Sequence, residues 1–202
     1  VRSWIPPALS EPRCVGVGAI RWVDTQQAPP RIPVPRGESF VRCTNLDRMK
    51  SGILGEMNEA YRVDVLKQYP FRVWPGENFV PEQVVLDQMA LDGWYLHWYD
   101  RTICIGGYLQ DGLTKGSGLL EVDNPMGYAM LANHKLKYLH GLEGVRAAIQ
   151  HIALSVVGRN PSYILESNRP WLTALMLPIG LVWSIRRHKQ FGNRVKKARS
   201  IT

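Results

Sequence analysis

The sequence predicts an α/β fold, in which part of a mixed sheet is flanked by helices and followed by a helical C-terminal extension. Residues 14–23 form a continuous apolar run with two glycines, which is typical of a buried strand. Residues 94–105 are rich in aromatic and β-branched side chains, which favour strands. The segments after residues 81 and 141 repeat apolar residues at helical spacing, which predicts helices packed on a core.

Composition and charge narrow the classes of function. The chain has 202 residues, 45% of them hydrophobic, which is enough to form a core and argues against disorder. Its net charge is +8, but residues 186–202 hold seven of the 25 Lys and Arg residues and no acidic residue. The rest of the chain therefore has 18 basic and 17 acidic residues. Because the body is nearly neutral, nucleic-acid binding is not expected.

Cysteine usage and the start of the chain bear on its compartment. Cys14, Cys43 and Cys104 are odd in number and widely spaced, which argues against a disulfide framework and against a zinc site. A reducing cytosol fits this pattern best. The chain begins at Val1 without a charged and apolar leader, so we expect an excerpt of a longer protein without a secretory signal.

Prolines dominate residues 1–36 outside the predicted strand, and the proline-rich residues 28–37 predict an extended connector. Gly16 and Gly18 in the strand do not form a nucleotide-binding fingerprint, because the third glycine and the following helix start are missing. No phosphate-binding loop is therefore expected here.

The next segment carries weaker signals. Residues 39–50 have few periodic cues. Residues 52–58 predict a turn that leads into a short strand, and residues 61–69 predict a short helix.

Three prolines hold residues 69–83 extended as far as Pro81, which suits the first position of a helix. The loop thus presents two carboxylates, Glu77 and Glu82, with Glu82 in the first helical turn. Two interpretations of Glu82 are open. The carboxylate either caps the free amides at the helix start or serves as a preoriented base.

The helix after Pro81 is expected to end at Gly93 and to be followed by one bent strand, or two short ones, over residues 94–105. His97 is interpreted as a packed strand residue, because no second histidine or cysteine lies at metal-ligand spacing. The glycine-rich residues 106–118 predict either a plain connector or a mobile lid.

Two further helices are expected before the C-terminal segment. Asn124 is a typical helix cap, and Pro125 suits a first turn, so a helix is predicted to about residue 138. A second helix is predicted from Gly141 to Val157, with apolar residues on one face.

Residues 170–185 contain no charged side chain. As a helix they would be about 24 Å long, shorter than the roughly 30 Å hydrocarbon core of a bilayer, and Pro178 and Gly180 would interrupt them. Basic residues follow. We therefore expect residues 170–199 to lie on an anionic membrane surface. The alternative is an apolar helix docked on the protein, with a solvated basic tail.

Three motifs, in this order, resemble the C-terminal half of family 2 glycosyltransferases, which have the GT-A fold and use nucleotide-sugar donors. The motifs are YRVDVLKQYPF at 61–71, GENFVPE at 76–82 and YLQDGLT at 108–114. The resemblance covers about residues 57–128. It implies an acceptor-side half with a GT-A-like mixed sheet, whose donor-binding half is absent from this chain. The implied divisions are 1–123 for the acceptor-side part, 124–167 for a helical extension, and 168–202 for an apolar helix plus basic tail.

The resemblance also implies site residues. Family members often carry a Glu-Asp pair at the start of the helix after the loop, and one carboxylate is the general base. Here the pair is Glu82-Gln83, which assigns the base to Glu82 and leaves Glu77 in reserve. The implied substrate-binding residues are Glu56, Trp74, Tyr108, Asp111 and Lys115.

A divalent metal, Mg²⁺ or Mn²⁺, is expected in the full-length enzyme, because family members hold it with an Asp-x-Asp motif. This chain has no such motif. Glu121-Val122-Asp123 is the nearest imitation, but it lies on the wrong side of the other motifs, so no metal ligand is assigned to this chain.

The expected function of the full-length enzyme is inverting transfer of a sugar from a nucleotide-sugar donor to an envelope or extracellular polysaccharide, or to a lipid-linked acceptor. The expected place is the cytoplasmic face of the plasma membrane, and the chain alone is expected to be inactive. The rival interpretation is a non-catalytic, membrane-associated interaction module with a degenerate glycosyltransferase fold. Gln83 and the missing metal motif favour the rival.

Overall fold

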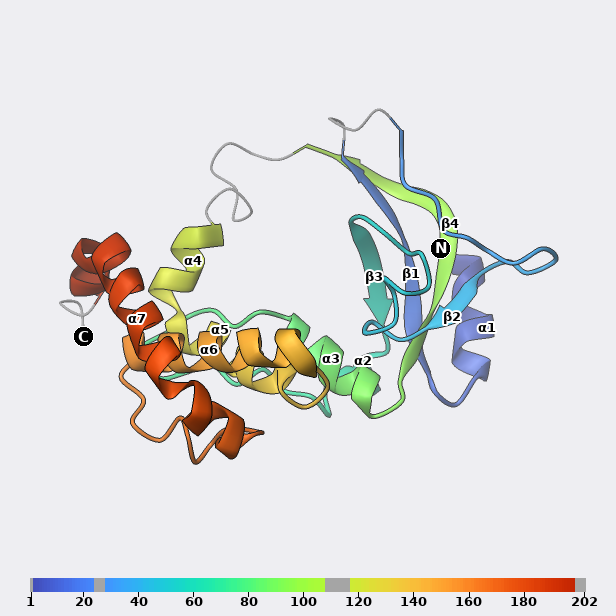
Figure 1. Cartoon of the computed structure of the whole chain (residues 1–202). Helices are drawn as coiled ribbons and strands as arrows, with labels where there is room; N and C mark the ends of the chain where they lie inside the picture. The colour runs from blue at the N-terminus through green and yellow to red at the C-terminus, as the bar shows by residue number, and fades with distance from the viewer. Residues whose placement is uncertain (1, 24–27, 108–116, 199–202) are drawn as a thin grey trace. The chain divides into compact units, whose positions relative to one another are not determined.

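The computed structural model describes residues 2–23, 28–107 and 117–198. Its elements are shown in Figure 1. In chain order they are η1 (Arg2–Trp4), α1 (Ile5–Ser10), β1 (Cys14–Val23), β2 (Val41–Cys43), β3 (Met57–Tyr61), α2 (Val63–Leu66), α3 (Gln83–Leu91), β4 (Tyr95–Gly106), α4 (Ser117–Asp123), α5 (Pro125–Lys135), α6 (Gly141–Val157) and α7 (Pro170–Ala198).

The chain forms two compact units. The first comprises Val1–Pro70 and Val85–Gln110 and contains the sheet, and the second comprises Phe71–Val84 and Asp111–Thr202 and contains α4 to α7. These units do not coincide with the boundaries predicted at residues 123 and 167. The proline-rich loop belongs to the same unit as the C-terminal helices, because it is hydrogen-bonded to helix α5.

The sheet has four strands in the order β2-β4-β1-β3. β1 and β4 are parallel, whereas β3 pairs with β1 and β2 pairs with β4 in antiparallel fashion. The mixed α/β class predicted from the sequence is therefore confirmed. The predicted strand at 94–105 is a single element, and its register with β1 shifts beyond Tyr99, opposite Ala19 and Ile20.

The two glycines of β1 serve close packing. A Cβ on Gly18 would lie 2.5 Å from the Trp98 ring, and one on Gly16 would collide with the Ala60 carbonyl oxygen of β3. Trp98 is fully buried, and its indole nitrogen donates a hydrogen bond to the Cys43 carbonyl at 3.1 Å. These glycines are needed because a backbone and an aromatic ring approach β1 from its two sides.

Both faces of the sheet are covered. On one face Trp98 packs with Ile20, Ile53, Val65 and Met89. On the other face, Ala8 of α1 packs with a cluster made of Cys14, Val17, Ala19 and Tyr99. Helix α1 was not predicted from the sequence, and the structure places its two prolines in the first turn, where proline is tolerated.

Helix α7 is longer than the predicted apolar segment, and it continues through Pro178 and Gly180. One of its faces packs on α6, and a Cβ on Gly180 would lie 2.5 Å from the Ile152 side chain. Leu172 packs with Leu136 and with alanines of α6. Within the described residues, no helix has both the length and the apolar character needed to cross a membrane.

Candidate functional site

The Glu77 carboxylate caps helix α5 from a distant part of the chain. One of its oxygens accepts a hydrogen bond from the Met126 amide at 2.7 Å, and the other accepts one from the Gly127 amide at 2.8 Å. Both amides belong to the first turn of α5, where backbone donors have no partner inside the helix. Glu77 thereby performs the role predicted for Asn124, whose side chain makes no capping hydrogen bond.

Asn124 instead holds the loop. Its side-chain oxygen accepts hydrogen bonds from the amides of Asn78 and Phe79, both at 3.0 Å. The loop backbone also approaches α5 closely, because a Cβ on Gly127 would lie 2.5 Å from the Phe79 carbonyl oxygen. We call the contacts that Glu77 and Asn124 make between this loop and α5 the loop–helix lock.

The lock gives Glu77 a structural role. Burial raises the pKa of its carboxyl, and the two amide donors oppose part of that rise. Each oxygen already accepts a backbone hydrogen bond, so the carboxylate is held in place against the start of α5. The expectation that Glu77 is the base in reserve stays a prediction, beside the capping role that its two hydrogen bonds show.

Glu82 has the opposite environment. Its side chain is exposed, and within the described part of the chain its carboxylate has no hydrogen bond or ion pair. Helix α3 begins at Gln83, so Glu82 immediately precedes the helix instead of lying in its first turn as predicted. The preceding turn is closed by a hydrogen bond from the Val84 amide to the Pro81 carbonyl. No capping bond from Glu82 competes with a role as base.

Of the other predicted substrate-binding residues, the structure describes two, Trp74 and Glu56. Trp74 is half-buried and packs against a cluster of Met126, Ala129 and Leu154, as a core tryptophan does. Glu56 belongs to the first unit, 3.6 Å from Arg21. Tyr108, Asp111 and Lys115 lie outside the described residues.

Glu121, the first acidic residue after the glycine-rich segment, is bound by other side chains. Glu121 accepts an ion-pair contact from Arg187 at 2.7 Å and a hydrogen bond from Gln150 at 3.3 Å. No group of three His, Cys, Asp or Glu side chains suited to a metal ion occurs among the described residues. Arg187, which the sequence places among the tail cations, is therefore a link between α7 and α4.

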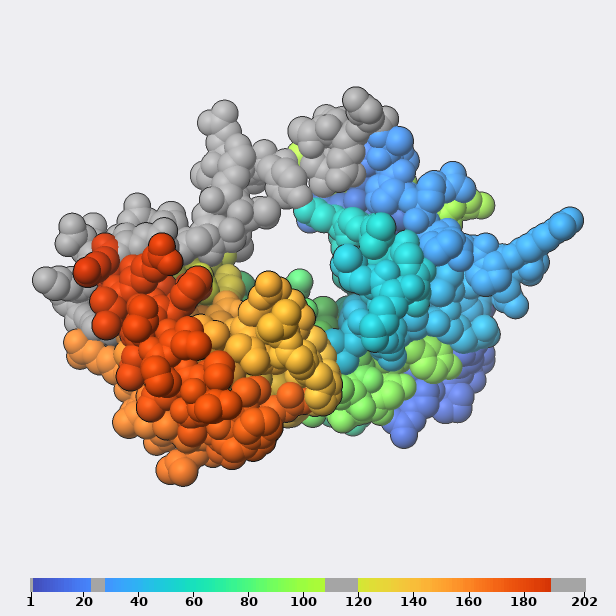
Figure 2. Space-filling model, viewed as in Figure 1, coloured from blue at the N-terminus to red at the C-terminus, as the bar shows by residue number. Residues whose placement is uncertain are grey.

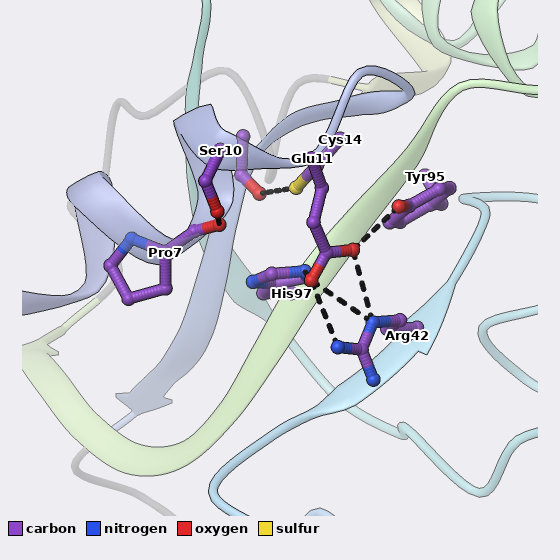
Figure 3. A network of polar contacts seen from close by, with 8 residues as sticks. Pro7, Ser10, Glu11, Cys14, Arg42, Tyr95 and His97 are labelled. Carbon is purple, nitrogen blue, oxygen red and sulfur yellow. Dashed lines mark hydrogen bonds and ion pairs between the residues drawn. The ribbon is translucent and has the colours of Figure 1, made fainter.

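A polar network in the first unit was not predicted from the sequence. Figure 3 shows the Glu11 carboxylate between the side chains of Arg42, Tyr95 and His97. Arg42 donates to both of its oxygens, at distances from 2.8 to 3.3 Å, and the Tyr95 hydroxyl donates at 2.6 Å. These donors come from β2 and β4, so the network fixes the end of α1 to two strands of the sheet.

His97 is the buried member of this network. Its ring is stacked on Phe40 with centroids 3.8 Å apart, and its Nε2 lies 3.2 Å from Glu11, though poorly aligned for a hydrogen bond. Burial lowers the pKa of His97, an effect that Glu11 only partly offsets. The residue is packed in a strand, as predicted, and its surroundings indicate a structural role.

An open groove of about 540 Å³ lies beside Phe40 in the same unit, with Trp4 and Tyr99 in its wall. Two carboxylates line it, and one of them is engaged, because Asp100 accepts from the Ile32 amide at 3.0 Å and pairs with an arginine at 2.7 Å. The groove therefore offers an aromatic wall and one exposed carboxylate, that of Glu38.

The Glu11 network predicts a specific acid sensitivity. Hydrogen bonds from Arg42 and then Tyr95 lower the pKa of Glu11 from 4.5 to about 2. The unfolded chain therefore binds a proton first as pH falls, and the folded chain loses stability between about pH 4.5 and pH 2. With allowance for partial exposure, we expect about 1–2 kcal/mol of the free energy of unfolding to disappear between pH 5 and pH 3.

Urea unfolding at these two pH values tests this prediction. Glu11→Gln should be less stable at pH 5 and should show a smaller difference between pH 5 and pH 3 than the native chain. Glu82→Gln is the matched control, since it removes an exposed carboxylate without a described partner. A native-like pH difference in Glu11→Gln would show that this carboxylate is not the stabilising group.

Comparison of the chain with protein-family models, curated proteins and solved structures gives no match. A functional proposal therefore depends on the residues and on their geometry.

Proposed function

We propose that this chain is the acceptor-side half of an inverting glycosyltransferase with a GT-A-like fold, and that Glu82 is its general base. The observation that carries the proposal is the contrast between two carboxylates on one loop. Glu77 is fully engaged by the amides of α5, whereas Glu82 is exposed and unengaged among the described residues. The order of the three sequence motifs and the mixed sheet support the same proposal.

Inverting transfer needs a carboxylate that accepts the proton of the acceptor hydroxyl, on the face opposite the leaving group. Such a base must keep an oxygen free and must be held in place before the substrate arrives. Glu82 meets the first requirement. The second is served by Pro81 directly before it and by the lock that fixes the same loop through Glu77.

In this proposal the donor is a nucleotide-sugar, and the acceptor is an envelope or extracellular polysaccharide or a lipid-linked precursor of one. The full-length enzyme works at the cytoplasmic face of the plasma membrane. A divalent metal bound to the full-length enzyme would neutralise the charge of the diphosphate leaving group. Because Glu121 is engaged by Arg187, the described residues do not fit such a metal, and we derive no step through it.

Nucleotide binding tests the division into two halves. We expect the chain alone to show no stoichiometric, micromolar site for a nucleoside diphosphate with Mn²⁺ or Mg²⁺, since its sequence has neither the Asp-x-Asp motif nor a phosphate loop. The measurement is calorimetric titration of the chain and, as the control, of the full-length protein, which should bind.

Micromolar binding to one site on the chain alone would contradict the absence of the donor half. If the full-length protein also fails to bind nucleoside diphosphates and transfers no sugar, the rival interaction module would replace the enzyme.

A further inference from the structure

Helix α7 has two faces of unusual composition. The face packed on the protein carries the buried residues Leu172, Thr173, Gly180 and Ser184, three of which are small or polar. The opposite face carries large apolar side chains that are exposed, and Figure 2 shows α7, in red, at the surface of the second unit. Trp171, Leu175 and Val182 are each more than 60% exposed, and Ile179 and Ile185 about half exposed.

The exposed side chains form one continuous stripe. Residues 171, 175, 182 and 189 are spaced by four or seven positions, so they lie on the same side of an α-helix. Ile179 and Ile185 flank this line. We call the exposed set Trp171, Leu175, Ile179, Val182 and Ile185 the apolar stripe. A stripe of this extent on a soluble surface marks a contact with an apolar partner.

Cationic side chains lie on the same side of helix α7 as the apolar stripe. Arg186 and Lys189 are exposed, and the Arg186 guanidinium lies 5.9 Å from the Trp183 ring centroid. Arg187, on the packed side, is held by Glu121. No acidic residue occurs in the sequence from 168 to 202, so the charges that this segment itself contributes are all positive.

We propose that α7 lies in the surface of an anionic membrane, with the apolar stripe in the boundary between head groups and acyl chains. The positive charge next to the stripe selects this occupant, because phosphate head groups bring negative charge and an apolar layer to the same plane. The packing of Thr173, Gly180 and Ser184 on the protein leaves only one face of the helix for lipid. The helix therefore lies along the membrane and does not enter it end-on.

This inference does not depend on glycosyl transfer. Vesicle binding measures it directly, so a failed transfer assay and a failed binding assay are distinguishable.

The first test is co-sedimentation of the intact chain with vesicles of phosphatidylcholine, with and without phosphatidylglycerol. The chain should bind the anionic vesicles, and binding should weaken as salt rises. Leu175→Gln with Val182→Gln should weaken that binding at least tenfold, because two apolar side chains no longer leave water. The matched control, Leu142→Gln with Leu165→Gln, changes exposed leucines outside the stripe and should bind like the native chain.

The second test removes charge. Arg186→Gln with Lys189→Gln should weaken binding to anionic vesicles by about 30-fold, from about 1 kcal/mol for each cation near the surface. Arg36→Gln with Lys67→Gln is the control, since both side chains are exposed and far from α7 in sequence. Thermal unfolding of every variant establishes that the fold is retained.

Three outcomes overturn the proposal. One is that the intact chain stays in the supernatant with anionic vesicles at low salt. Another is that binding is unchanged in Leu175→Gln with Val182→Gln, which would leave attachment to the basic tail alone. The third is self-association that the stripe variants abolish without any vesicle binding, which would make the stripe an interface between copies of this chain.

Discussion

Glu77→Gln should lower the free energy of unfolding by about 2–3 kcal/mol, because the substitution breaks the loop–helix lock. The amides of Met126 and Gly127 bind different oxygens of Glu77, and glutamine replaces one of these oxygens by an NH₂ group, so in the same side-chain orientation one amide loses its acceptor. The side-chain NH₂ would then face a backbone N–H donor. The negative charge that the start of α5 favours would also be lost.

Urea unfolding at neutral pH measures this effect. Glu82→Gln is the control on the same loop, and it should change the free energy of unfolding by less than about 0.5 kcal/mol, as expected for an exposed carboxylate without a partner. An unfolding midpoint of Glu77→Gln equal to that of the native chain would contradict the lock.

The regular elements followed from local patterns. The strand predicted at residues 14–23 is β1, and the helix predicted from Gly141 to Val157 is α6. Elements with little local signal were missed. Strand β2 has only three residues, and it exists because Val41 and Cys43 pair with β4 far along the chain. Such pairing leaves no periodicity for a single sequence to display.

The sequence could not distinguish the roles of Glu77 and Glu82, because the partners of Glu77 lie far along the chain. Glu77 finds its partners 49 and 50 residues further along, at Met126 and Gly127. The sequence predicted Asn124 as the cap of α5, because a capping residue usually lies next to the helix that it caps. The network around Glu11 joins residues up to 86 positions apart, so no spacing within the sequence could reveal it.

Helix α7 places some residues of the apolar segment 170–185 against the protein and leaves others exposed. The sequence offered two alternatives for residues 170–185, contact with lipid or docking on the protein. Docking is confirmed for one face, which uses Gly180 to approach Ile152 closely. Leu172 packs inward, whereas Trp171, Leu175 and Val182 remain exposed, and this asymmetry emerges only when small residues and neighbouring helices are placed together.

The most direct test of Glu82 as base is the turnover of the full-length enzyme with Glu82→Gln. We expect kcat to fall by about 10²-fold or more, because the acceptor hydroxyl loses its proton acceptor, while donor affinity changes little. Glu77→Gln, assayed where it remains folded, should lose less, since its carboxylate does not reach the reaction. Near-normal turnover of Glu82→Gln, beside an inactive but folded Glu77→Gln, would contradict the assignment and transfer the role to Glu77.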